Sequence, residues 1–123
     1  MKPKQVPDEL RQLLPLTPAV FFVLYSIADG EKHGYAIMKE ATALSGGEFR
    51  MGPGTLYTTL QRLLDLGLIG EVAGPGDPEE RGARRRYYRL TGNGRAVLEA
   101  EVGRMDLVMR MARRKKLVPR PAE

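Results

Sequence analysis

The side chains best suited to chemistry lie between residues 53 and 65, where leucines recur at helical spacing. Centring the buried side on Leu56 turns the opposite side of this helix to solvent. The outer face and its flanks then carry Thr55, Tyr57, Thr58, Gln61 and Arg62. Threonine, glutamine and arginine hydrogen-bond base edges and phosphates in the major groove of a duplex. A plain amphipathic helix with a solvated outer face explains the same pattern.

The start of this helix favours contact with an anion. Pro53 suits the first helical position, and Gly54 leaves the backbone open. A helix N-terminus with accessible amides binds phosphate readily.

A second chemical feature is an excess of arginine. Residues 81–98 hold six arginines and no Asp or Glu, including Arg84, Arg85 and Arg86. Like charges on a short hairpin repel one another unless an anion is near. Tyr87 should face outward between arginines, whereas Tyr88 should face the core. A solvated cationic edge strand that prevents aggregation is the alternative.

Residues for catalysis or metal binding are scarce. The sequence has no cysteine and a single histidine, His33, which is expected to fix the start of a helix. One histidine forms neither a metal site nor a catalytic triad. We therefore expect no enzyme activity, no cofactor and no metal.

The bulk composition is that of one soluble domain. The chain has 123 residues, of which 42% are hydrophobic and 28% charged, with a net charge of +5. Neither a signal peptide nor a membrane span is expected, because residues 19–25 form the longest apolar run. The net positive charge favours a polyanionic partner, and we expect a cytoplasmic protein.

Turn and cap signals divide the chain into a mainly helical fold with a small β-hairpin. Thr17 and Pro18 mark a helix start, and Gly67 and Thr91 mark an end and a cap. The predicted helices are 18–28, 34–44, 53–66 and 92–117, and the predicted strands are 49–51, 68–73 and 84–90. We expect residues 1–15 to form an arm with a helical turn or two, and residues 118–123 to form a disordered tail.

The last helix carries a seam spaced four, three, four and three residues apart: Leu98, Val102, Met105, Met109 and Ala112. This coiled-coil-like spacing favours a homodimer. The methionines could instead line a small-molecule pocket or belong to the chain's own core.

Four segments together resemble the PadR family of bacterial transcriptional regulators. They are His33-Gly34-Tyr35, Gly54-Thr55-Leu56-Tyr57, Leu66-Gly67-Leu68-Ile69 and the run from Arg84 to Thr91. The resemblance covers residues 14–117, and the single last helix is similar to the family's compact subgroup.

This resemblance implies a winged helix-turn-helix over residues 16–91, followed by a dimerisation helix over 92–117. It implies a homodimer that represses promoters on double-stranded DNA and is released by a small-molecule effector. Thr55, Tyr57 and the outer positions of the 53–66 helix would contact DNA, Tyr35 would support the start of the 34–44 helix, and the wing arginines would grip the flanking groove. Capture of planar ligands between tryptophans, known in one branch, is in doubt because the chain has no Trp.

Two functions from different classes fit this sequence. The first is a sequence-specific DNA-binding repressor that binds a palindromic operator as a homodimer. The alternative is a winged-helix protein-interaction module that presents its hairpin to an acidic partner and does not bind DNA.

Overall fold

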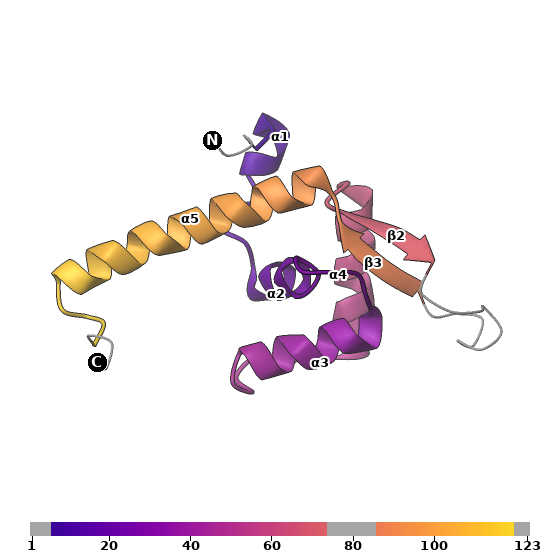
Figure 1. The fold of residues 1–123 in the computed structure, drawn as a ribbon, viewed down its shortest axis with the longest axis horizontal. Helices are drawn as coiled ribbons and strands as arrows, with labels where there is room; N and C mark the ends of the chain where they lie inside the picture. Colours follow the sequence, from indigo (N-terminus) through magenta and orange to yellow (C-terminus); the bar gives the residue numbers. More distant parts are fainter. Residues whose placement is uncertain (1–5, 74–85, 120–123) are drawn as a thin grey trace.

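The computed structural model describes residues 6–73 and 86–119. The elements follow in the order α1 (Asp8–Arg11), α2 (Pro18–Ser26), β1 (Lys32–His33), α3 (Gly34–Leu44), α4 (Pro53–Asp65), β2 (Ile69–Ala73), β3 (Arg86–Leu90) and α5 (Gly92–Arg114). Figure 1 shows α2 in the middle, α3 beneath it, α4 and the sheet at one end, and α5 projecting past the body. The predicted fold, mainly helical with a small β element, is confirmed.

Helix α2 forms the centre of the core because it is apolar on nearly every side. Thr17 caps it as predicted, since its Oγ1 accepts a hydrogen bond of 3.3 Å from the Val20 amide. Val23 and Leu24 are completely buried in one cluster with side chains from α3 and α4. The helix ends at residue 26 rather than 28, because the Ala28 amide bonds the Tyr25 carbonyl and tightens the last turn.

Helices α3 and α4 begin and end where local signals place them. The predicted bounds of α3 are confirmed, and Gly46 and Gly47 follow it with φ of 65° and 84°. Gly67 follows α4 with φ of 74°, and the Leu68 amide bonds the Leu63 carbonyl at 3.0 Å. This is the arrangement that makes glycine favourable after a helix.

The predicted strand at 49–51 is wrong. The segment folds back on Ser45, whose Oγ accepts from the Phe49 amide at 2.9 Å and lies 3.1 Å from the Phe49 carbonyl. The Phe49 ring stacks on Phe22 of α2 at 5.4 Å. These contacts close a turn and occupy both backbone groups of Phe49.

In the described part of the chain, the sheet has three antiparallel strands in the order β1-β3-β2, of which only β2 and β3 were predicted. Strands β2 and β3 form the expected hairpin, with Ile69 opposite Leu90 and Ala73 opposite Arg86. The return strand begins at Arg86 in the described part of the chain, and predicted strand residues 84 and 85 lie outside it. The additional strand β1 pairs Lys32 with Tyr88 and His33 with Tyr87. Two residues are too short to show an alternating pattern in a sequence.

From residue 6 onward, the predicted N-terminal arm packs on the body. Only α1 is helical, and Val6 and Leu10 are 9% and 5% exposed within the hydrophobic core. The Leu16 amide donates a 2.8 Å hydrogen bond to Oε2 of Glu101 on α5. Apolar contact and this bond therefore hold the N-terminal segment on the core and on α5.

Helix α5 packs on the core through its first turns and then leaves it. Thr91 caps it as predicted, accepting from the Gly94 amide at 3.0 Å. The helix ends at Arg114 rather than residue 117, because Lys116 has φ of 60° and the Leu117 amide bonds the Ala112 carbonyl. None of the helices within the described ranges has the length and apolar content needed to cross a bilayer.

Candidate nucleic acid interface

Helix α4 turns its predicted polar face to solvent. Pro53 occupies the start, and Leu56, Leu60 and Leu63 are each 1% exposed against the core. A helix with one narrow apolar stripe leaves its other sides exposed to solvent. All the positions predicted for base or phosphate contact on this helix are exposed: Gly54, Thr55, Tyr57, Thr58, Gln61 and Arg62. No heavy atom lies within 4 Å of a Cβ built on Gly54, so its backbone is open as predicted.

The exposed side chains of α4 point to different flanks. Gln61 donates a 3.0 Å hydrogen bond to Oδ1 of Asp65 on the outer face. Arg62 borders a small pocket formed with residues 12–20, whereas Tyr57 lies beside Gly34 at the start of α3. The structure thus divides the predicted surface, with Arg62 on the α2 side and Tyr57 on the α3 side.

The hairpin of β2 and β3, called the wing below, carries Arg86 and Arg89 on its surface. Arg86 forms an ion pair with Glu71 across the hairpin, with 3.3 Å between Nη1 and Oε1. The Arg89 guanidinium lies 3.4 Å from the point where a Cβ on Gly70 would stand, so the glycine leaves room for it. Arg84 and Arg85 belong to the residues that the structure does not describe. On the described strands, Arg86 and Arg89 therefore supply the exposed positive charge.

The two wing tyrosines take the sides that their alternation predicts. Tyr88 is 3% exposed in the core, and this burial raises the pKa of its hydroxyl. Tyr87 is on the opposite face but is half-buried, because its ring meets the His33 ring edge-on at 5.5 Å. Strand β1, which the sequence did not reveal, thus covers part of the tyrosine expected to face out.

His33 has the structural role expected for it. Its Nδ1 accepts a 3.1 Å hydrogen bond from the Ala36 amide and caps α3. Its ring also stacks on Tyr35 at 6.5 Å. Tyr35 is 57% exposed, so it lies on the surface beside the cap.

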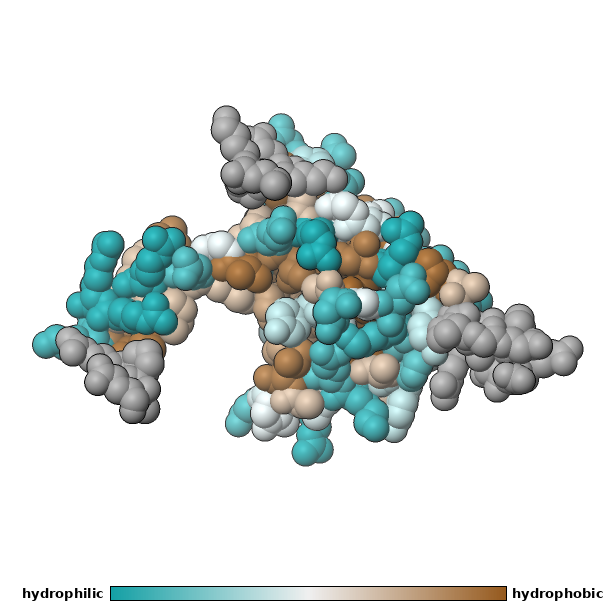
Figure 2. Space-filling model, in the orientation of Figure 1, coloured by the Kyte–Doolittle hydropathy of each residue, from teal (hydrophilic) through white to brown (hydrophobic). Residues whose placement is uncertain are grey.

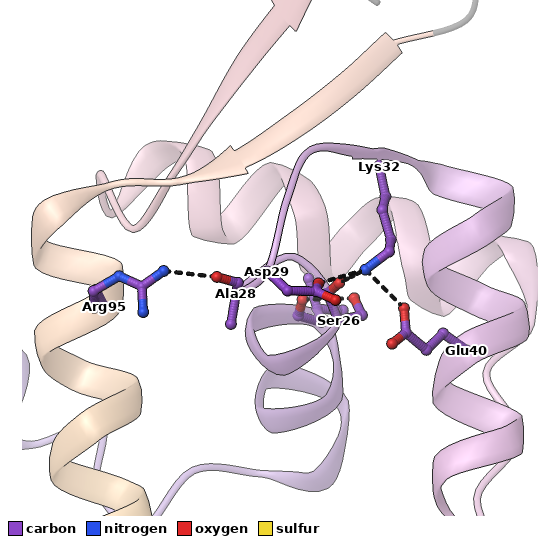
Figure 3. A network of polar contacts seen from close by, with 7 residues as sticks. Ser26, Ala28, Asp29, Lys32, Glu40 and Arg95 are labelled. Carbon is purple, nitrogen blue, oxygen red and sulfur yellow. Dashed lines mark hydrogen bonds and ion pairs between the residues drawn. The ribbon is translucent and has the colours of Figure 1, made fainter.

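Lys32, which sequence reasoning missed, connects β1 to the two helices beside it. The Lys32 ammonium donates to the Ser26 carbonyl, lies 2.8 Å from Asp29 Oδ1 and 3.1 Å from Glu40 Oε2, and so joins β1 to α2 and α3 (Figure 3). Burial opposes its charge, but hydrogen bonds to both carboxylates outweigh that effect and raise the pKa of Lys32. The bond from Lys32 lowers the pKa of Asp29. Strand β1 therefore keeps a fixed position between the helices and β3.

Arg95 holds the first turns of α5 against the segment that follows α2. Its guanidinium donates a 2.7 Å hydrogen bond to the Ala28 carbonyl, at the end of α2 (Figure 3). The start of α5 is thereby fixed to the elements that carry the wing.

Glu101 is the second polar residue that the sequence did not single out. Its side chain is 1% exposed, and Arg104 Nε lies 2.6 Å from its Oε1. The hydrogen bond from Arg104, joined by that from the Leu16 amide, outweighs burial and lowers the pKa of Glu101. The carboxylate thus fixes α5 to the segment before α2.

The predicted seam on α5 divides between core and surface. Leu98 is 5% exposed and belongs to the chain's own core, whereas Val102 is 45% and Met109 38% exposed. Met105 and Ala112 are half-buried. The exposed apolar surface of α5 therefore starts at Val102, and in Figure 2 the projecting part of the molecule shows brown and tan side chains between the teal ones.

No group of three or more metal-binding side chains occurs among residues 6–73 and 86–119. Helix α4 exposes hydrogen-bond donors and acceptors, and the neighbouring hairpin exposes positive charge, which together are the chemistry of nucleic acid recognition.

Comparison with known proteins agrees with this geometry. The model of the transcriptional regulator PadR-like family matches residues 23–100, from α2 into α5. The chain belongs to this PadR-like family. Family membership makes it a relative of transcriptional regulators and not of enzymes.

Two sequence relatives and one solved structure illustrate the similarity. The chain is 42% identical over 76 residues to the transcriptional regulator Rv3488 of Mycobacterium tuberculosis, covering 62% of this chain and 64% of that protein. It is 41% identical over 87 residues to an uncharacterised 37.1 kDa protein of transposon TN4556 from Streptomyces fradiae, covering 71% and 23%. This PadR-like chain therefore spans less than two thirds of either relative.

The structural match shows that the fold is shared. Bacillus subtilis PadR, solved in complex with operator DNA, superposes with a TM-score of 0.61 at 22% identity. The match covers 72% of this PadR-like chain and 47% of that one.

Proposed function

We propose that this chain is a sequence-specific DNA-binding transcriptional regulator that reads its operator with α4. The observation that carries the proposal is the exposed polar face of α4 beside a wing with exposed arginines. Relatives support it, since one is a named transcriptional regulator and another was solved with operator DNA. Such a regulator acts on the chromosome, hence in the bacterial cytoplasm at the nucleoid.

In this proposal, the outer face of α4 enters the major groove. Thr58 and Gln61 offer groups that match base edges, and Gln61 exchanges its bond to Asp65 for one to a base. The open backbone at Gly54 approaches a phosphate. Because Arg62 and Tyr57 lie on opposite flanks, they meet opposite walls of the groove.

The wing supplies contacts that are independent of sequence. Arg86 and Arg89 are exposed, and their guanidinium groups suit bidentate contact with phosphate. Arg84, Arg85 and Tyr87 belong to the same proposed contact. Phosphate contacts orient a protein on the duplex and leave base selection to the helix in the groove.

We further propose a homodimer formed by α5. Val102, Met105, Met109 and Ala112 continue outward from Leu98 along one side of the helix. This side has no covering partner within the described chain, and a second copy would bury it. Two copies related by a twofold axis would place their α4 helices about 34 Å apart, on a palindromic operator.

The regulator is proposed to repress and to respond to a small effector. A dimer that covers its operator excludes polymerase from an overlapping promoter. The effector would lie among the methionines between the two α5 helices and favour a dimer state with a different α4 spacing. Such a ligand releases DNA only through differential affinity for the two states.

Selection of bound fragments from the source genome tests the function directly. The wild-type chain should enrich fragments that share a twofold-symmetric sequence, and the chain with Thr58→Ala and Gln61→Ala should not. The matched control carries Glu99→Ala and Arg113→Ala, which change two exposed residues on α5. If wild-type protein enriches no fragments and does not bind random duplex at low salt, the protein-interaction alternative replaces this function.

A further inference from the structure

An open groove of about 590 Å³ lies between α3 and the segment that enters α4. Tyr35, Lys39 and Thr42 form one wall, and Arg50, Gly52 and Pro53 form the other. Methionine side chains contribute an apolar floor. The groove thus combines a wide opening with one cation on each wall.

Both cations of this groove face solvent with their charge unneutralised. Lys39 Nζ lies 5.4 Å from the centre of the Tyr35 ring, and Arg50 is exposed. Within the described residues, neither forms an ion pair. By contrast, Arg86 and Arg104 have carboxylate partners at 3.3 and 2.6 Å. The groove therefore attracts an anion more strongly than these paired sites do.

A line of touching side chains connects the groove to the wing. Tyr87 meets His33 at 5.5 Å, His33 stacks on Tyr35 at 6.5 Å, and Tyr35 lies beneath Lys39. The far wall of the groove then leads into Pro53 and the start of α4. In Figure 1 the wing strands, α4 and the start of α3 lie at the same end of the molecule. The groove is therefore continuous with the proposed DNA-binding surface.

We propose that this groove receives the sugar–phosphate backbone of duplex DNA, with Lys39 and Arg50 binding phosphate from its two walls. This inference rests on the proposed function and extends it to side chains outside α4 and the wing. The groove volume of about 590 Å³ can hold a phosphodiester with its sugar, and Tyr35 offers an apolar face for the sugar. Contacts of this kind fix how the protein is oriented on the duplex and do not select bases.

The test compares the wild-type chain with the double variant Lys39→Gln and Arg50→Gln on operator and random duplex. Removing two phosphate contacts from each subunit of the proposed dimer should reduce the slope of log affinity against log salt by about 3.6. Over a fourfold rise in salt, the wild-type dimer should therefore lose about 150-fold more affinity than the double variant. Operator and random duplex should be affected alike, and phosphate-ethylation interference should lose specific positions.

Two control chains isolate the groove from the overall charge. Arg113→Gln with Arg114→Gln removes the same charge at the far end of α5 and should leave both slope and interference pattern unchanged. Lys39→Arg with Arg50→Lys keeps both charges and should restore most of the slope. Thermal unfolding of each variant should match wild type, since both replaced side chains are exposed.

Three results overturn the proposal in distinguishable ways. If wild type binds DNA and the double variant keeps its slope and interference pattern, the groove does not contact the backbone. If the variant weakens the operator and spares random duplex, the groove selects bases instead. If wild type binds no DNA, the proposed function fails, and the groove proposal fails with it.

Discussion

Gly94 in the first turn of α5 lies directly against the backbone carbonyl of Leu68. A Cβ built on Gly94 would stand 1.9 Å from the Leu68 oxygen and 2.8 Å from Leu90 Cδ1. Thr91 closes the same junction, because its Oγ1 donates a 2.7 Å hydrogen bond to the Gly67 carbonyl. The end of α4, the wing and α5 therefore meet at one point where only glycine fits.

Gly94→Ala should destabilise the fold by about 3 kcal/mol, because backbone must move to admit the methyl group. Urea unfolding at neutral pH measures the change in the free energy of unfolding. Gly103→Ala is the matched control on the same helix, because no heavy atom lies within 4 Å of its Cβ position. That control should stabilise the chain by up to about 1 kcal/mol through higher helix propensity. Equal effects of the two substitutions would contradict the close approach.

Glu101→Gln should cost about 1–3 kcal/mol at neutral pH, because it replaces a charged hydrogen-bond acceptor of Arg104 and the Leu16 amide. The pKa of Glu101 is lowered in the fold from 4.5, so its carboxylate stabilises the fold above that pH. This stability is lost as the pH falls below 4.5 and through the folded-state pKa. The difference in unfolding free energy between wild type and variant should therefore be smaller at about pH 3 than at pH 7. Glu99→Gln, an exposed neighbour, should show no such convergence.

The elements with local signals were predictable from the sequence. Helix α3 has its predicted bounds because glycines follow its last turn, and Thr91 caps α5 because its hydroxyl can reach the Gly94 amide. The leucine spacing of α4 determined which side of that helix faces solvent. These features depend on neighbours a few residues away, which a sequence displays.

Features formed by distant contacts were not predictable. Glu101 resembles a surface residue in an amphipathic helix, and its partner Leu16 is 85 residues away. Strand β1 exists because Lys32 and His33 meet β3, and no alternation marks two residues. The groove of Lys39 and Arg50 likewise depends on how α3 packs beside the entry to α4. Sequence reasoning found the proposed reading helix but missed the side chains that support and border it.

Arg62→Ala should weaken operator binding by about 1–3 kcal/mol, with the loss confined to some base positions, if this arginine reads a base. Competition binding against a set of single-base operator variants measures the effect. Arg110→Ala, which changes an exposed arginine of α5, is the control and should bind as wild type. Wild-type affinity in the Arg62 variant would exclude this side chain from recognition.

Glu71→Gln and Arg86→Ala should change DNA affinity in opposite directions. Removing Glu71 frees Arg86 from its 3.3 Å ion pair, so affinity for any duplex should rise. Removing Arg86 deletes one phosphate contact from each subunit, so the salt slope of the proposed dimer should fall by about 1.8 for operator and random duplex alike. Titrations at several salt concentrations provide both slopes. A loss restricted to the operator would assign Arg86 to base recognition.

Val102→Glu combined with Met109→Glu should convert a dimer into monomers, because two carboxylates would be buried in an apolar contact. Both positions are more than a third exposed in the single chain, so the substitutions should leave the monomer folded. Sedimentation equilibrium measures the oligomeric state. Operator affinity should fall at least about a hundredfold, since each half-site would then bind independently. Arg113→Gln, on the same helix, should remain dimeric. A double variant that stays dimeric would place the subunit contact elsewhere on the surface, because the projecting part of α5 would then be free of any partner.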